Sequence, residues 1–317
     1  MSSEIATRPI MTAKELLELN ITEIPMLVEG LMQQTGLVGI TGSSDVGKST
    51  FLRQLALSIA SGESHFLNFP LHTRSNKVIY VSTEDMMTDI AVLIRKQLRN
   101  PQVIDDCWNN LIFITETQNL RGNLDSLMEQ HSPDCVIIDA FTDIHTGDNN
   151  MSTSVRAPLN KFKNLAQKHH SLFVVLNHIG KRAESNLPSK HNSLGSQGFE
   201  AKMRMLAEIR LDKTDDSLRH FCIVKGNYIP NDQKKNSYVL KMDPETLLFK
   251  DTGERVLYEY LGSNRSSMRD NWMPRCCEIK AENPDMTLDN IYNQVIEEGF
   301  TGSRATIWNY LQLCEET

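Results

Sequence analysis

One eight-residue segment constrains this chain more than any other feature of its sequence. Residues 42–49 read GSSDVGKS and match the pattern G-x-x-x-x-G-K-[ST]. A short β-branched run, GLVGITG, leads into the segment, and KSTFLRQLALSIA follows it with the apolar spacing of an amphipathic helix. Backbone N–H groups and the helix dipole converge on such a turn, which predicts an anion-binding loop rather than a chance match to a glycine-containing turn.

The loop residues have separate tasks in a nucleotide site. We expect Lys48 to reach the β- and γ-phosphates and Ser49 to ligate Mg²⁺, so that ATP and Mg²⁺ are the expected ligands. The residues expected to contact the nucleotide are Gly42, Ser43, Ser44, Asp45, Val46, Gly47, Lys48, Ser49 and Thr50.

The hydrophobic pattern beyond the loop alternates between strands and helices. Buried runs such as CVIID and LFVVL are separated by helical patterns, which predicts an α/β fold with a mostly parallel central sheet. Further strand-like stretches at 205–213, 220–228 and 238–243 predict antiparallel additions, and residues 256–262 predict a last strand. We therefore expect a core domain over residues 1–262, a linker over 263–270 and a small all-α domain over 271–317.

Charge and hydropathy exclude several classes of protein. The net charge is −7, so nucleic acid could bind only through local basic patches. No run of about 18 apolar residues predicts a membrane span, and the N-terminal segment lacks the apolar core of a signal peptide. We expect a cytoplasmic protein without membrane partners.

Acidic residues end two of the expected strands. Asp139 follows an apolar run and is expected to hold the metal with Ser49, although it could simply terminate the strand. Its successor is Ala140, so a general base must come from elsewhere. Glu84 ends the other strand and is favoured as that base, with Asp85 as the rival; either could instead cap the following helix.

Asn177 and His178 follow the strand at 172–176. We expect His178 to sense the γ-phosphate and report hydrolysis to the loop beyond it; the alternative is a structural histidine. That loop, residues 180–198, is rich in Gly, Ser and Asn and is expected to be mobile.

In this order, the motifs resemble the RecA-like hexameric ATPases, most closely the RepA-type helicases of plasmids and phages. The matching segments include TAKELLELNITEIPMLVEGLM, GLVGITGSSDVGKST, VIYVSTEDMMTDIAVLIRKQL, VIIDAFTDI, VVLNHIGK, GSQGFEAKMRMLAEIRL and VKGNY, over roughly residues 12–260. The resemblance implies a RecA-like core, Glu84 as catalytic base, and a homo-hexamer or other ring with ATP sites between subunits.

The same resemblance implies a cation that acts in trans. Lys225, in the segment VKGN, matches the basic residue that reaches the γ-phosphate of the neighbouring subunit, and Arg210 is a second candidate. Ordinary surface ion pairing is the alternative for both. The 180–198 loop falls where the family places DNA-contacting loops, with Lys181, Arg182 and Lys190 as the expected contacts. A solvated loop without a ligand is the alternative.

The C-terminal segment GFTGSRATIWNYL looks like the helix-turn-helix of transposases and resolvases. Arg304, Thr306 and Asn309 would then face DNA. Residues 264–317, however, hold five basic and nine acidic side chains, a net charge of −4, so docking to a protein or packing on the core are alternatives.

Two classes of function fit these features. The first is an ATP-driven ring motor of the helicase type, acting on DNA in replication, mobilisation or recombination of a mobile element. The second is a non-motor ATPase switch that regulates a transposase, recombinase, replication protein or other protein partner through the C-terminal helices. The sequence leaves open whether single- or double-stranded DNA is bound.

Overall fold

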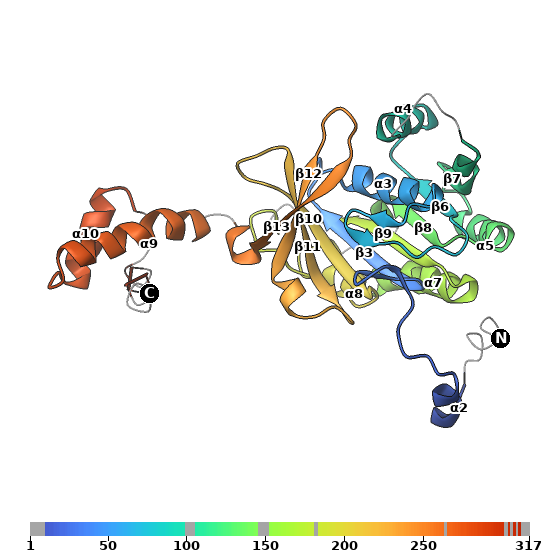
Figure 1. Cartoon of the computed structure of the whole chain (residues 1–317), viewed down its shortest axis with the longest axis horizontal. Helices are drawn as coiled ribbons and strands as arrows, with labels where there is room; N and C mark the ends of the chain where they lie inside the picture. Colours follow the sequence, from blue (N-terminus) through green and yellow to red (C-terminus); the bar gives the residue numbers. More distant parts are fainter. Residues whose placement is uncertain are drawn as a thin grey trace. The chain divides into compact units, whose positions relative to one another are not determined.

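A nine-stranded sheet forms the centre of the larger part of the chain (Figure 1). The computed structural model describes residues 10–98, 105–144, 152–180, 183–262, 265–300, 304, 307–308 and 310–311. The strand order is β13-β12-β11-β10-β3-β9-β8-β6-β7. These strands span Gly36–Gly42 (β3), Val78–Ser82 (β6), Leu111–Ile114 (β7), Cys135–Asp139 (β8), Leu172–His178 (β9), Met205–Leu211 (β10), Leu218–Gly226 (β11), Asn236–Met242 (β12) and Phe249–Leu257 (β13).

The strands from β10 to β7 run parallel to one another. The prediction of an antiparallel addition was therefore wrong for β10, which is parallel to β3 and antiparallel to β11. Gly42 lies opposite both His178 and Ile209 in the ladder, and Ser82 lies opposite Asp139. The carboxyl ends of six parallel strands therefore meet at one edge of the sheet, where α/β proteins bind their ligands. The predicted α/β fold with a mostly parallel sheet is confirmed.

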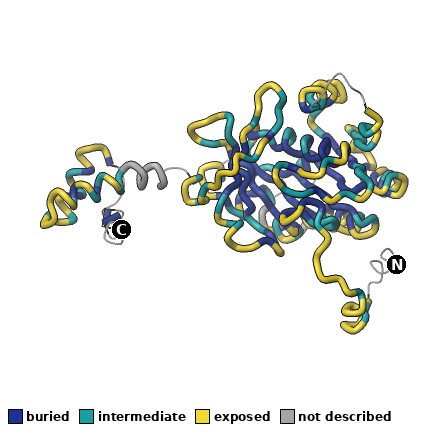
Figure 2. The backbone as a smooth tube through the Cα atoms, viewed as in Figure 1, coloured by how far each residue is buried: buried dark blue, intermediate teal, exposed yellow. Residues whose placement is uncertain are grey.

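Helices cover both faces of this sheet because its strands are apolar on both sides. One hydrophobic cluster packs α3 against one face, and a second packs α5, α7 and α8 against the other. Figure 2 shows the buried positions gathered along the central strands. The helices of this part of the chain are α2 (Ala13–Glu18), α3 (Lys48–Ala60), α4 (Met87–Gln97), α5 (Leu120–His131), α6 (Phe141–Ile144), α7 (Ser152–His169) and α8 (Ser196–Glu200).

Short elements complete the edges of this unit. They are β1 (Met26–Val28), β2 (Met32–Gln33), β4 (His65–Phe66), β5 (Phe69–Pro70) and the 3₁₀ turns η1 (Asp106–Asn110) and η3 (Asp232–Lys234). Strands β1 and β2 pair with each other, as do β4 and β5.

The last strand differs from its sequence-based prediction. β13 begins at Phe249 and ends at Leu257, and residues Tyr258–Tyr260 form a 3₁₀ turn, η4, in place of the predicted strand at 256–262. β13 is the edge strand of the sheet and most of its positions are exposed, so it lacks the apolar alternation that marks a strand in sequence.

The chain divides into two compact units, and the second holds residues 185–188 and 256–317. It contains α9 (Arg265–Glu282) and α10 (Leu288–Glu297), and its own core includes Cys276, Ile279, Ile291 and Phe300. Residues 265–270, which the sequence assigned to a linker, form the start of α9. Within the described ranges, none of the helices is both long enough and apolar enough to cross a bilayer.

Candidate functional site

The glycine-containing loop lies between β3 and α3, as its pattern predicted. Gly47 has φ of +88°, and a Cβ there would lie 3.0 Å from Cζ of Phe249. At Gly42 a Cβ would lie 2.5 Å from the carbonyl oxygen of Ile209 on the neighbouring strand β10. Both positions therefore require glycine, one for its backbone conformation and one for the close approach of a second strand.

Lys48, the first residue of α3, is buried within this loop, and its Nζ donates a hydrogen bond to the carbonyl oxygen of Ser43 at 2.5 Å. Burial lowers the pKa of Lys48, and the negative charges of Asp139, Glu84 and Asp45 oppose that shift. A buried ammonium that bonds only loop carbonyl oxygen is well placed to exchange that partner for a phosphate oxygen.

The metal-binding residues predicted from the sequence lie side by side. The hydroxyl of Ser49 donates to Oδ1 of Asp139 at 3.1 Å. In the described part of the chain, His, Cys, Asp and Glu side chains nowhere gather in threes that could hold a metal. A hydroxyl next to a carboxylate fits Mg²⁺, which takes few protein ligands and completes its shell with water and phosphate oxygens.

Tyr80 holds Asp139 from the adjacent strand β6. Its phenol donates to Oδ2 of Asp139 at 2.5 Å, and both side chains are buried. Burial raises the pKa of Asp139, and the hydrogen bonds from Tyr80 and Ser49 oppose that shift by stabilising the carboxylate. Sequence reasoning missed Tyr80, because a tyrosine within a buried strand looks like a core residue.

Glu84 and Asp85 differ in their surroundings. Asp85 lies 3.5 Å from Nη1 of Arg53, a buried arginine of α3 that also donates through Nε to Gln97 at 3.1 Å. Glu84 is largely exposed, and its Oε1 lies 3.8 Å from Nε2 of His178. Asp85 is thus tied to α3, whereas Glu84 faces the strand end that carries His178.

His178 connects this edge of the sheet to the following loop. Burial lowers its pKa, as does the positive charge of Lys48, so the ring is neutral at neutral pH. The backbone N–H of Leu194 donates to the carbonyl oxygen of His178 at 2.8 Å, and Asn177 donates to that of Leu194 at 2.9 Å. The far end of the loop is therefore bonded directly to the strand end beside the phosphate loop.

The loop at 180–198 forms hydrogen bonds and an ion pair with the neighbouring strands and helix. The backbone N–H of Ser189 and the amide of Asn192 both donate to Oε2 of Glu208, which is fully buried. Lys190 lies 3.2 Å from Oε1 of Glu200. The segment 189–195 is therefore bonded to β9, β10 and α8, whereas the sequence predicted a mobile loop. Lys181 and Arg182 lie outside the described residues.

The two cations expected to act in trans lie away from their own phosphate loop or are paired. Lys225 is three ladder positions from the level of Gly42, about 10 Å along the strands. Its Nζ donates to the carbonyl oxygen of Glu200 at 2.7 Å and lies 3.5 Å from Oε1 of the same residue. Arg210 is buried and lies 2.6 Å from the carboxylate of Glu208.

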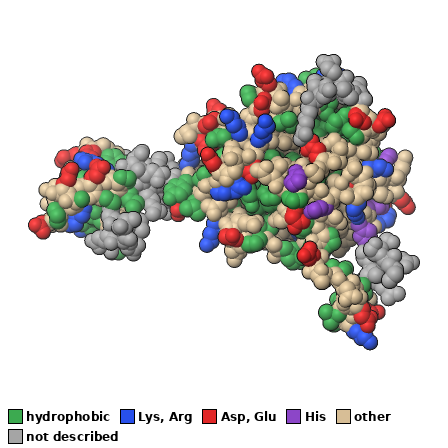
Figure 3. All heavy atoms as spheres, in the orientation of Figure 1, with side chains coloured by type: hydrophobic (Ala, Val, Ile, Leu, Met, Phe, Trp, Pro, Cys, Tyr) green, Lys and Arg blue, Asp and Glu red, His purple; other side chains and the backbone are tan. Residues whose placement is uncertain are grey.

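The C-terminal unit pairs its described cations with oxygen acceptors. Arg304 forms an ion pair with Asp289, Arg275 pairs with Glu298 at 2.9 Å, and Lys280 donates to two carbonyl oxygens. Thr306 and Asn309 lie outside the described residues. On the face drawn in Figure 3, basic and acidic side chains are interspersed rather than gathered in one stripe.

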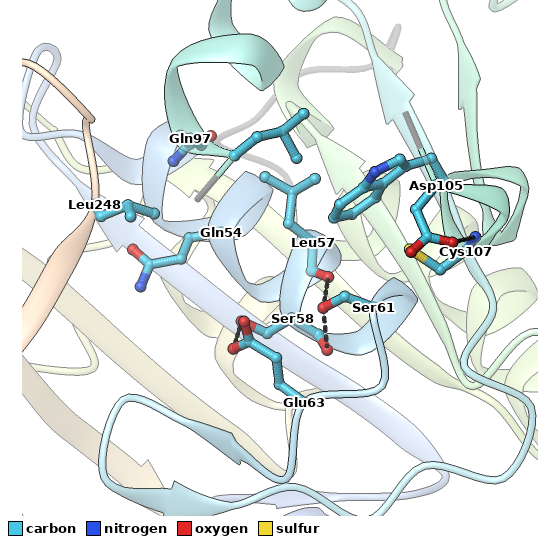
Figure 4. Close-up of a pocket in the computed structure, with 11 residues that line it drawn as sticks. Gln54, Leu57, Ser58, Ser61, Glu63, Gln97, Asp105, Cys107 and Leu248 are labelled. Carbon is cyan, nitrogen blue, oxygen red and sulfur yellow. Dashed lines mark hydrogen bonds between the residues drawn. The ribbon is translucent and has the colours of Figure 1, made fainter. Parts of the chain in front are cut away.

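A cavity of about 320 Å³ lies beside α3 and is separate from the phosphate loop. Leu57, Trp108 and Leu248 give it apolar walls, and Gln54 and Glu63 add polar groups (Figure 4). Its lining includes none of the residues 42–50, so the predicted nucleotide site does not use it.

Comparisons with known proteins bear on the family and the fold. The sequence matches a protein family described as an AAA domain over residues 4–184. The structure is similar to a solved ATPase domain, with 13% identity, a TM-score of 0.55, and coverage of 76% of this chain and 96% of that one. The RadB recombinase aligns with 16% identity, a TM-score of 0.48, and coverage of 68% and 90%. No curated protein matches the chain. The fold is the RecA-like P-loop ATPase fold.

The bond from Tyr80 gives a first prediction. Tyr80→Phe removes the donor to a buried carboxylate, which is worth about 1.5–3 kcal/mol, and so raises the pKa of Asp139 further. We expect a higher Mg²⁺ concentration for half-maximal binding of a fluorescent ATP analogue, with the largest difference at low pH, where Asp139 protonates first.

The matched control is Tyr238→Phe, a tyrosine-to-phenylalanine change on β12 of the same sheet. We expect it to leave the Mg²⁺ requirement unchanged. An unchanged requirement in Tyr80→Phe as well would contradict the role given to Tyr80.

Proposed function

The chain belongs to the AAA domain family, and from that premise we propose that it binds and hydrolyses ATP as a ring-forming motor that acts on DNA. One observation carries the proposal. Lys48, Ser49 and Asp139 converge at one edge of the sheet, and Glu84 and His178 face each other at that edge. The residues proposed to bind phosphate, to bind the metal and to act as base thus lie on α3 and at the ends of β6, β8 and β9.

Hydrolysis at this edge divides into steps that named residues perform. The loop N–H groups and Lys48 bind the β- and γ-phosphates. Ser49 and Asp139 would hold Mg²⁺, which would neutralise phosphate charge. Glu84 accepts a proton from a water molecule as the oxygen of that water attacks the γ-phosphorus. The bond from that phosphorus to the bridging oxygen breaks, and ADP and inorganic phosphate leave.

Glu84 is preferred to Asp85 as the base because of what each carboxylate contacts. A base must be able to turn toward the attacking water. Asp85 is held near the buried guanidinium of Arg53. The side chain of Glu84 is 59% exposed, and among the described charged or titratable side chains it lies close to the His178 ring alone. Neutral His178 can donate a hydrogen bond to the carboxylate or to a γ-phosphate oxygen.

A ring of subunits explains why Lys225 lies away from its own phosphate loop. A cation placed about 10 Å back along the sheet cannot complete the site of its own subunit, and to reach a neighbour it would exchange its bonds to Glu200 for a phosphate oxygen. We propose a homo-hexamer or similar ring in which Lys225 reaches the γ-phosphate of the adjacent subunit. Arg210 is less suited to this role, because its guanidinium is buried against Glu208.

DNA contact is assigned to the loop that follows His178. Lys190 is its described cation, and repetition around a ring would give a basic channel in an acidic protein. The bonds from Leu194 and Asn177 to the strand end support a mechanical link between this loop and the phosphate site. The family resemblance suggests a helicase-type motor in replication, mobilisation or recombination of a mobile element.

A second candidate is a non-motor ATPase switch that docks a recombinase, transposase or replication protein. The C-terminal unit favours it, because the net charge of −4 over residues 264–317 and the paired Arg275 and Arg304 disfavour duplex DNA.

ATP turnover at low salt, measured without DNA, with single strands and with duplex, separates these functions. We expect single strands to stimulate turnover about tenfold, and the stimulation to fall steeply with salt because phosphate contacts release counterions. Lys48→Ala is the inactive control. Equal rates under all three conditions would contradict a DNA motor and favour the protein-docking switch.

Subunit mixing tests the action of Lys225 in trans. Lys225→Ala and Glu84→Gln should each reduce turnover by at least about 10³-fold, since each removes one part of a shared site. Mixed rings contain sites with Glu84 from one subunit and Lys225 from its neighbour, so we expect mixing to restore part of the activity. If no ratio of the two variants restores turnover, the site is not shared between subunits.

Glu200 gives a further prediction, because one carboxylate lies near both Lys190 and Lys225. In Glu200→Gln both lysines lose their ion pair, so we expect DNA-independent turnover to rise about two- to fivefold and stimulation by DNA to shrink. Glu254→Gln, on the exposed edge strand β13, is the control. Unchanged basal turnover in Glu200→Gln would show that this pairing does not restrain Lys225.

A further inference from the structure

Arg219 of β11 donates a hydrogen bond to the backbone of the phosphate loop. Its Nε donates to the carbonyl oxygen of Val46 at 3.0 Å, and its Nη1 donates to the carbonyl oxygens of Asp216 and Leu218 at 2.6 and 2.9 Å. The residue is 5% exposed, and the loop lies 173 residues away in sequence. No motif links the two segments, so sequence reasoning did not single out this arginine.

The buried charge of Arg219 is stabilised by carbonyl dipoles rather than by a close anion. Among the described residues, Arg219 has no ion-pair partner, and the nearby charge of Asp216 opposes the lowering of its pKa. Burial lowers the pKa of Arg219, which expresses the cost of keeping this charge away from water. Buried charges are normally paired, and three carbonyl dipoles stabilise the guanidinium less than an anion would.

The peptide bond between Val46 and Gly47 links Arg219 to the nucleotide side of the loop. In a trans peptide the C=O and the following N–H point in opposite directions. A carbonyl of Val46 held toward Arg219 therefore turns the N–H of Gly47 to the side away from Arg219. The ring of Phe249 packs behind Gly47 and limits other orientations.

We propose that Arg219 is a positioning residue for the β-phosphate of the bound nucleotide. It fixes the N–H of Gly47 in the orientation that binds phosphate, and the phosphate supplies the negative charge that the buried guanidinium lacks. The proposal rests on nucleotide binding at this loop and adds a residue of the same subunit that the loop motif does not contain.

A purely structural role makes a different prediction. An arginine that only fills space between β11 and the loop would change the stability of the fold without changing affinity in the molecules that remain folded. Nucleotides that differ in their phosphates separate the two roles, because only ATP and ADP carry a β-phosphate, whereas AMP does not.

The test compares Arg219→Gln, Arg219→Met and Arg219→Lys by titration with fluorescent ATP, ADP and AMP analogues. We expect the Met variant to weaken ATP and ADP by about tenfold or more and to leave AMP within about twofold. The Gln variant keeps a donor without charge and the Lys variant keeps charge, so both should lose less. Arg255→Gln, whose arginine pairs with Asp251 on the same sheet, is the matched control.

Thermal melting of each variant keeps the result interpretable, because only folded variants are compared. Folded Arg219 variants that bind ATP with the wild-type dissociation constant would overturn the proposal, as would an equal loss for all three nucleotides. Should the Met variant not fold, the Lys and Gln variants carry the comparison. A wild-type protein that binds no ATP would instead refute the proposed function, which Lys48→Ala tests separately.

Discussion

The buried carboxylate of Asp139 is the constraint on which the nucleotide site depends. It lies at the end of β8, where water cannot stabilise its charge, and it is held by Ser49 of α3 and Tyr80 of β6. Such a group is stable as an anion only with close donors or a cation. The three elements β8, α3 and β6 are thus fixed relative to one another, and a divalent ion at this point would strengthen the arrangement.

The topology of the sheet determines which charged groups lie near the phosphate loop and which lie away from it. Parallel strands bring Gly42, Asp139 and His178 to one edge, because their carboxyl ends coincide. The antiparallel strand β11 reverses that direction, so its first residues, including Arg219, lie near the phosphate loop while Lys225 lies toward the opposite end. Strand β11 therefore carries Arg219 near the phosphate loop and Lys225 near the other end of the sheet.

The sequence predicted best those parts of the fold and site whose residues are contiguous in the chain. The loop at 42–49 and the parallel strands follow from local pattern, since a turn and its flanking elements are contiguous. Tyr80, Arg53 and Arg219 could not be found in this way, because each acts on a residue brought near by folding. The choice between Glu84 and Asp85 is similar: adjacent carboxylates look alike in sequence, and only the pairing of Asp85 with Arg53 distinguishes them. The edge strand β13 was misplaced because an exposed strand carries little hydrophobic signal.

The charged side chains of the two units differ in how they are paired. In the larger unit, Lys190 and Lys225 lie near a single carboxylate, that of Glu200, so a phosphate that attracts one lysine changes the environment of the other. In the C-terminal unit, Arg275 and Arg304 each have a carboxylate of their own, and the surrounding charge is negative. To bind DNA phosphates, Arg275 and Arg304 would each have to leave their carboxylate partners. The larger unit is therefore the better candidate for contact with DNA, and the C-terminal unit for contact with a basic protein surface.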